Sequence, residues 1–217
     1  MTDAQRRDWV EIAATVLLAF AAVATAWSSY QATRWNGEQA KTSGKVNKTR
    51  IEAARAADLA NAQEQVDVAT FMQWVDSYAR GEDELVSFYR TRFRPEFKPA
   101  FNAWLATKPL KTKGAPLTPF AMPQYRLAAK TEAARLDQRA EELSAQVRRN
   151  IQRASNYVLG VVLFAVALFF AGMSTKLTAP GLRKAMLVVG YVIFLGTAVW
   201  IATSPVSIAI QTDQPPD

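Results

Sequence analysis

The stretch I-A-A-T-V-L-L-A-F-A-A-V-A-T-A-W, residues 12–27, contains no charged side chain. Two further uncharged apolar runs, 157–173 and 185–202, lie almost back to back near the other end of the sequence. At about 1.5 Å per residue, each run would form a helix roughly 24–29 Å long, close to the ~30 Å hydrocarbon core of a bilayer. The three runs therefore predict three transmembrane helices rather than buried helices of a soluble domain.

The spacing of the apolar runs divides the chain into four parts. In order, these are an N-terminal segment with the first span, a water-facing insert, a pair of spans joined by a short basic turn, and an acidic tail: 1–27, 28–155, 156–203 and 204–217. We predict an all-α integral membrane protein with three transmembrane helices. The insert is predicted to be a long helical hairpin between the first and the second of them.

Aromatic side chains stand near the ends of the apolar runs, where amphipathic rings favour the headgroup level of a membrane. They are Trp9, Trp27, Tyr157 and Trp200. After the first run, five residues recur at positions i, i+3, i+4, i+7 and i+8, which predicts one helix face. These five are Trp27, Tyr30, Gln31, Arg34 and Trp35. Together with Trp9 they are our candidates for membrane-interface contact, either as simple anchors or for recognition of a lipid headgroup or a partner helix.

Lys and Arg in short segments indicate which side of the membrane each segment faces. Arg6, Arg7 and the basic turn 174–184 share one side, whereas the tail 211–217 has no basic residue. This distribution predicts a cytoplasmic N-terminus and an extracytoplasmic insert. Six bases flanking the membrane on the insert side favour the opposite orientation: Arg34, Lys41, Lys45, Arg148, Arg149 and Arg153. A cleavable signal peptide ending near 24–26 is an alternative to the first span, and it would also export the insert.

Both ends of the insert are predicted to continue the helices of the adjacent spans. No Pro or Gly interrupts 28–35, although a break at Ser43-Gly44 is an alternative. On the C-terminal side, a helical stripe enters the second span: Leu136, Ala140, Leu143, Val147, Ile151, Ala154 and Val158. An apolar face is also predicted on the ascending helix: Val68, Phe71, Met72, Val75, Tyr78 and Ala79. We expect a turn at Gly81, followed by one descending helix from Glu82 to about Leu105.

Prolines and aromatic residues alternate in the loop 94–123 and at its edges. The aromatic residues are Phe93, Phe97, Phe101, Trp104, Phe120 and Tyr125. Large rings usually gain stability by packing onto a neighbouring helix. The same residues are our candidates for an exposed docking surface, so both interpretations stay open at this point.

The residues that support most catalytic chemistry are absent from the sequence. There is no Cys and no His, which excludes thiol nucleophiles, disulfides and the usual zinc and haem ligands. The net charge of +7 is spread along the chain, which is typical of a solvated surface near anionic lipid rather than of nucleic-acid binding. The acidic groups 82–84 and 141–142 are better explained by a helix start and a solvated face than by a metal site. We expect no catalytic residue, no metal and no cofactor.

Four segments resemble an uncharacterised family of bacterial inner-membrane proteins. They are A-T-A-W-S-S-Y-Q-A-T-R-W (24–35), F-R-P-E-F-K-P-A-F-N-A-W-L-A-T-K-P-L (93–110), P-F-A-M-P-Q-Y (119–125) and L-F-F-A-G-M-S-T-K (168–176). The resemblance implies a location in the bacterial inner membrane, but the family has no assigned activity. The layout alone is also similar to the MotA, TolQ and ExbB proton-channel family, whose insert is cytoplasmic.

These observations predict a non-enzymatic membrane protein that self-associates and uses its helical arm as a scaffold or partner-docking element. The expected partners are membrane lipids, further copies of the chain and a protein at the arm, with no nucleic acid. The alternative is an oligomeric ion channel, or a subunit of one, lined by Ala- and Gly-rich helices. The size of the assembly distinguishes the two, because a monomer cannot form a pore from several copies.

Overall fold

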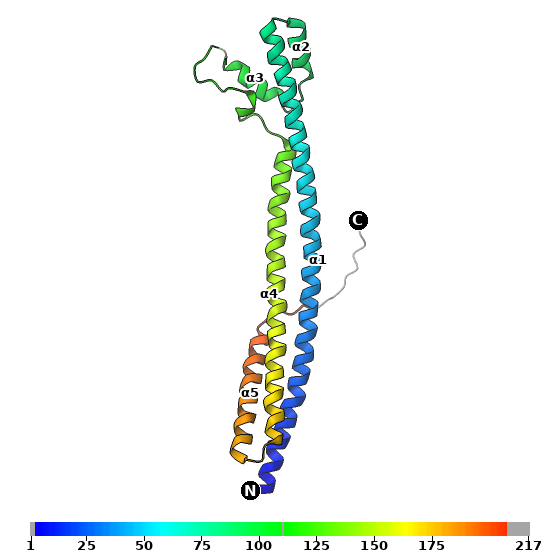
Figure 1. Ribbon diagram of the computed structural model, residues 1–217, viewed down its shortest axis with the longest axis vertical. Helices are drawn as coiled ribbons and strands as arrows, with labels where there is room; N and C mark the ends of the chain where they lie inside the picture. Colours follow the sequence, from blue (N-terminus) through cyan, green and yellow to red (C-terminus); the bar gives the residue numbers. More distant parts are fainter. Residues whose placement is uncertain (1–2, 110, 208–217) are drawn as a thin grey trace. The chain divides into compact units, whose positions relative to one another are not determined.

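The computed structural model describes residues 3–109 and 111–207, and all regular elements in these ranges are helical (Figure 1). They are α1 (Asp3–Arg80), α2 (Asp83–Arg92), α3 (Lys98–Ala106), the 3-10 turn η1 (Pro119–Ala121), α4 (Ala128–Lys176) and α5 (Pro180–Ala202). Three of them, α1, α4 and α5, are long and apolar enough to cross a membrane. Most of the tail predicted at 204–217, namely residues 208–217, lies outside the described residues.

The helix of the first apolar run continues into the polar insert without a break. Helix α1 has 78 residues and passes through Gly37 and Gly44, so the alternative of a break at Ser43-Gly44 is wrong. A glycine inside a helix costs only about 1 kcal/mol relative to alanine, which packing of the neighbouring turns offsets. Helix α4 is also continuous from the insert into the second apolar run, as predicted.

The chain divides into two compact units, which we describe separately. The first unit comprises 1–44 and 144–217, and it contains the three apolar helical segments. The second unit comprises 45–143, which includes the polar part of α1, helices α2 and α3, and the start of α4.

In the first unit, α1, α4 and α5 lie side by side (Figure 1). They pack through two clusters of buried side chains. One cluster consists of Ala14, Leu17, Ala171 and Leu187, and the other of Ala32, Trp35, Ala154, Tyr157, Phe164 and Ile201. Glycines allow close approach of the helices. A Cβ atom on Gly160 would lie 2.8 Å from Cδ1 of Ile201, and one on Gly190 would lie 3.2 Å from Cδ2 of Leu17. Small residues at such crossings are typical of helices packed in membranes.

In the second unit, buried residues of α1 recur every seven positions. They are Val46, Ala53, Ala60, Asp67 and Trp74. Seven residues make nearly two helical turns, so these side chains lie along one face of the helix. On α4, Ala133 and Ala140 are buried, and Glu141 lies 3.6 Å from the guanidinium of Arg50 on α1. The two helices therefore lie side by side in this unit, with alanines allowing close contact.

The apolar face predicted on the ascending helix is wrong in its position. Phe71 is buried, but Val68, Met72, Val75 and Tyr78 are exposed. The buried face of α1 instead includes Asp67 and Trp74. A search for apolar residues at helical spacing does not find this face, because Asp67 is charged. On α4 the predicted stripe also departs from the buried face, since Ile151 and Val158 are exposed whereas Tyr157 is buried.

The turn at Gly81 is confirmed, whereas the single descending helix is not. Gly81 has a φ of 73°, in the left-handed region that glycine adopts without strain. The descending segment consists of two helices, because α2 ends at Arg92 and α3 starts at Lys98. Pro95 lacks an N–H donor and disfavours helical backbone at Arg94, whereas a proline fits the first turn of α3.

Candidate functional site

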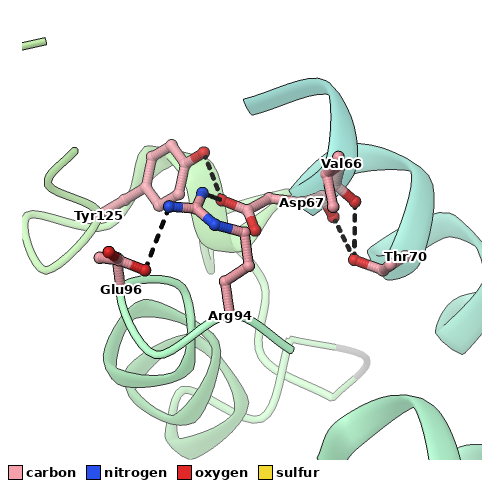
Figure 2. A network of polar contacts seen from close by, with 6 residues as sticks. All are labelled: Val66, Asp67, Thr70, Arg94, Glu96 and Tyr125. Atoms are coloured by element: carbon pink, nitrogen blue, oxygen red, sulfur yellow. Dashed lines mark hydrogen bonds and ion pairs between the residues drawn. The ribbon is translucent and has the colours of Figure 1, made fainter. Parts of the chain in front are cut away.

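A network of polar side chains surrounds the buried Asp67 in the second unit (Figure 2). The side chain of Asp67 on α1 is 0% exposed. Its Oδ2 atom accepts a hydrogen bond from Nη1 of Arg94 at 2.9 Å and another from the Tyr125 hydroxyl at 3.1 Å. Nη2 of Arg94 also lies 3.1 Å from a carboxylate oxygen of Glu96. The network thus connects α1 to the α2–α3 break and to the segment before α4.

Burial dominates the electrostatics of this network. It raises the pKa of Asp67 above its ordinary value, although Arg94 and the Tyr125 hydroxyl act in the opposite direction. Burial and the neighbouring Asp67 carboxylate also raise the pKa of Tyr125. Within the described part of the chain, the Oδ1 atom of Asp67 has no hydrogen-bond partner. Because a buried charge is tolerated only when it is paired, the stability of this region depends on Arg94 and Tyr125 keeping their positions.

Aromatic rings form a core next to the Asp67 network. The buried members are Phe71, Trp74, Phe93, Phe97, Phe101 and Trp104. Many of their contacts are edge-to-face, with ring centroids 5.3 Å apart for Phe71 and Trp104 and 4.8 Å apart for Trp74 and Phe101. Trp104 donates a hydrogen bond from Nε1 to the carbonyl of Pro116 at 2.8 Å. Phe97, Phe101, Trp104 and Phe120 thus connect the proline and aromatic loop to this core, and each edge-to-face pair contributes about 0.5–1.5 kcal/mol beyond its buried area.

This core contains the residues that the sequence offered as a docking surface. Phe93, Phe97, Phe101 and Trp104 are no more than 6% exposed, and Phe120 and Tyr125 pack against the same cluster. The burial agrees with the packing interpretation of these six residues. Other large apolar side chains are exposed in this unit: Met72, Val75, Tyr78, Leu85, Phe88 and Leu117.

The residues predicted to contact a membrane interface separate into two groups. Trp9, Trp27 and Tyr30 are exposed, and the rings of Trp27 and Tyr30 have centroids 6.0 Å apart. Gln31 and Trp35 are instead buried in the core of the first unit. Arg34 is half-buried, and its Nε atom has no hydrogen-bond partner among the described residues. The face predicted by helical spacing is thus divided between the outer surface and the interior.

The buried members of this set hold the segment that follows α5. Nε1 of Trp35 and the hydroxyl of Tyr157 each donate a hydrogen bond to the carbonyl of Pro205, both at 3.2 Å. The backbone N–H of Ser207 donates to Oε1 of Gln31 at 3.0 Å. These three bonds tie the segment after α5 to α1 and α4. The sequence placed Tyr157 at a membrane interface but carried no sign that it meets Pro205.

The Asp67 network was also missed at the level of sequence. A signal for it exists in the seven-residue spacing of Ala60, Asp67 and Trp74, which places a carboxylate on a line of buried side chains. Nothing in the local sequence indicates that Arg94 and Tyr125 are its partners. The described residues contain no group of three or more potential ligands that could hold a metal ion.

No protein-family model, curated protein or solved structure matches this chain.

Proposed function

We propose that this protein is a membrane-anchored scaffold that acts without enzymatic activity and docks a partner protein through its second unit. One observation carries the proposal. Helix α1 joins, in a single unbroken helix, an apolar segment to a polar segment that supplies Asp67, Phe71 and Trp74 to a folded core.

The outer faces of the apolar helices support the anchoring role. Several of their large apolar side chains are more than half exposed: Phe20, Val23, Val162, Phe169, Val192 and Val199. Helices that are apolar on both their packed and their exposed faces are typical of segments surrounded by lipid. The insert 28–155 would then face water. Resistance of the full-length protein to extraction by alkaline carbonate tests this role, and release into the soluble fraction would contradict it.

We place the protein in a bacterial inner membrane, with a cytoplasmic N-terminus and an extracytoplasmic insert. The bases in the turn 174–184 support this orientation, and the family resemblance supports the location. Alkaline phosphatase fused at residue 110 should be active, whereas a fluorescent protein fused at the same position should be dark. The reverse pattern would overturn the orientation and leave the anchoring role intact.

Small residues on outer faces support self-association through the spans. A Cβ added to Gly172 or Gly196 would meet no atom within 4 Å apart from the adjacent residues and the backbone of its own helix, and Ala22 and Ala26 are exposed. Such residues let helices of other copies approach closely. Native mass spectrometry of the protein in nanodiscs should detect an oligomer, which Gly196→Leu should weaken and Val188→Leu on the same helix should not. A monomeric wild-type protein would refute self-association, whereas a ring with an open axis would favour the ion-channel alternative.

The exposed apolar residues of the second unit support docking of a protein partner. Met72, Val75 and Tyr78 lie near the end of α1, and Leu85 and Phe88 lie on α2. A photo-crosslinking residue in place of Val75 should yield one discrete adduct in cells. The adduct should disappear when Met72→Asp and Phe88→Asp are introduced, but persist with Glu132→Gln on α4. If the adduct persists when Met72→Asp and Phe88→Asp are both present, the partner docks on another surface.

A further inference from the structure

An arginine from another helix lies over the indole of Trp35 in the first unit. The guanidinium carbon of Arg153, on α4, lies 4.5 Å from the centroid of the Trp35 ring. Arg34 precedes Trp35 on α1, and its buried Nε atom has no hydrogen-bond partner among the described residues. Arg149 lies one turn before Arg153 on the same side of α4. We refer to Arg34, Trp35, Arg149 and Arg153 as the Trp35 cluster.

The surroundings of the Trp35 cluster carry an excess of positive charge. Segments 28–41 and 144–156 contain five Lys or Arg residues and a single acidic residue, Glu38. Glu38 lies 3.3 Å from Nζ of Lys41, so it is already paired. Within the residues that the structure describes, none of the arginines of the cluster forms an ion pair. An anion supplied from outside these residues would therefore be attracted.

The position of the Trp35 cluster along the helices matches the headgroup level of the proposed anchor. Tyr157 stands at the start of the second apolar run, and Arg153 precedes it by about 6 Å along α4 at the rise of an α-helix. Trp27 and Tyr30, which are exposed, precede Arg34 on α1. Exposed Trp and Tyr rings favour the interface between hydrocarbon and water. The guanidinium groups would thus lie at the depth of lipid phosphates.

The indole at the centre of the cluster is held in place. Its Nε1 atom donates a hydrogen bond to the carbonyl oxygen of Pro205, which also accepts a hydrogen bond from the hydroxyl of Tyr157. A guanidinium that stacks on an aromatic face keeps its in-plane N–H donors free for oxygen atoms. Arg153 is therefore presented with a defined orientation, and such pre-organisation lowers the entropy lost on binding.

We propose that the Trp35 cluster binds the headgroup of an anionic phospholipid. This inference rests on the proposed anchoring in a membrane. Arg153 and Arg34 donate hydrogen bonds to the phosphate oxygens, and Arg149 adds positive charge on the same side of α4. A zwitterionic lipid is a poorer ligand, because the arginines repel the cationic group of its headgroup.

The binding test uses the full-length protein in detergent, with native mass spectrometry to count bound lipids during titration. Phosphatidylglycerol should bind more tightly than phosphatidylcholine. Arg149→Gln with Arg153→Gln should weaken phosphatidylglycerol binding roughly 10- to 30-fold, as expected for two bases near a membrane surface. Lys176→Gln with Lys184→Gln removes the same charge near the turn between α4 and α5, and should leave binding within about twofold of wild type. Equal binding of the two lipids, or equal loss in both variants, would overturn the proposal.

Two further measurements separate a lipid site from general attraction by charge and from a site for free phosphate. Arg153→Lys keeps the charge but loses the stacked planar guanidinium, so it should lower the preference for phosphatidylglycerol several-fold, and an unchanged preference would overturn the role given to Arg153. Inorganic phosphate should not compete with the lipid, and full competition would indicate a free-phosphate site instead. Failure of this inference is distinguishable from failure of the anchoring proposal. A protein that resists carbonate extraction but has no lipid preference refutes only the lipid site.

Discussion

The buried carboxylate of Asp67 and the guanidinium of Arg94 form an ion pair across 27 residues of sequence, with 2.9 Å between Oδ2 and Nη1. Arg94 lies where Pro95 interrupts the helical path between α2 and α3. The pair therefore joins this break directly to α1, next to the aromatic core. Asp67 therefore connects three segments of the second unit from a fully buried position.

We expect Asp67→Ala to destabilise the second unit by about 2–4 kcal/mol, because it leaves Arg94 and the Tyr125 hydroxyl without their buried partner. Hydrogen exchange of the full-length protein should show faster exchange in α3. Asp76→Ala on the same helix is a matched control, since Asp76 pairs with Arg80 on the exposed surface and its loss should change stability by less than about 1 kcal/mol. Equal effects of the two substitutions would contradict the role given to Asp67.

The stability of the second unit should depend on pH through Asp67. The folded state raises the pKa of this carboxyl above the ordinary value of 3.8, mainly by burial, so it binds the proton more tightly than the unfolded chain does. The corresponding stability is fully present below that ordinary value and is lost as the pH rises through the folded-state pKa. Asp67→Asn does not titrate. The stability of wild type minus that of the variant should therefore fall with rising pH.

Denaturant unfolding of the full-length protein between about pH 4 and pH 7, followed by tryptophan fluorescence, measures this difference. Glu96 and Glu64 also lie in the electrostatic surroundings of the network, and subtraction of the variant removes most of their contribution. A difference that grows with rising pH would mean that attraction by Arg94 outweighs the burial of Asp67.

Close packing of α4 and α5 should be sensitive to the size of residue 160. A Cβ at Gly160 would lie 2.8 Å from Cδ1 and 3.1 Å from Cγ1 of Ile201 and 3.7 Å from Oγ of Ser28. Alanine therefore requires the Ile201 side chain to move, whereas the branched side chain in Gly160→Val requires a shift of the helices. We expect Gly160→Val to lower the free energy of unfolding by about 1–3 kcal/mol. Thermal unfolding in detergent measures the effect. Gly37→Val on α1, at an exposed position with open space around it, should be close to neutral, and similar losses at both positions would disprove the packing argument.

The segment after α5 should be released when its side-chain donors are removed. Trp35→Phe with Tyr157→Phe keeps an aromatic ring at each position but deletes the two hydrogen bonds to Pro205, each contributing about 0.5–1.5 kcal/mol. Amide exchange in the peptide 203–207 should become roughly tenfold faster, as follows from a loss of about 1.4 kcal/mol. Tyr30→Phe, which changes an exposed ring, is the control. Unchanged exchange in the double variant would show that these bonds do not hold the segment.

Several features of the fold could be predicted because they depend on neighbouring residues. The apolar runs, the continuation of the first one as a helix through 28–35 and the turn at Gly81 follow from composition and from local backbone preferences, whereas the continuity of α1 through Gly44 was left open by the sequence. The break between α2 and α3 could also have been predicted from Pro95, whose effect on the preceding residue is local. The prediction of one descending helix gave this proline too little weight.

The buried faces were predicted less well, because burial is decided by the partner helix and not by the polarity of the residue. Asp67 is buried while Val68 beside it is exposed, and Gln31 is buried while Trp27 is exposed. A pattern that assigns apolar residues to the interior and polar residues to the surface predicts the opposite burial for both pairs. Polar residues enter the interior when a distant group satisfies them, and that group has no fixed spacing along the chain.

By itself, the amino-acid sequence determined where the helices form and which of them are apolar enough to span a membrane, since both properties arise from short-range periodicity and composition. Only the tertiary structure decided that Asp67 meets Arg94 and Tyr125, and that Trp35 meets Arg153 and Pro205. These partners are separated by 27 to 170 residues in sequence. Their meeting depends on how packed helices bring distant segments together, and it is these long-range contacts that create both candidate sites.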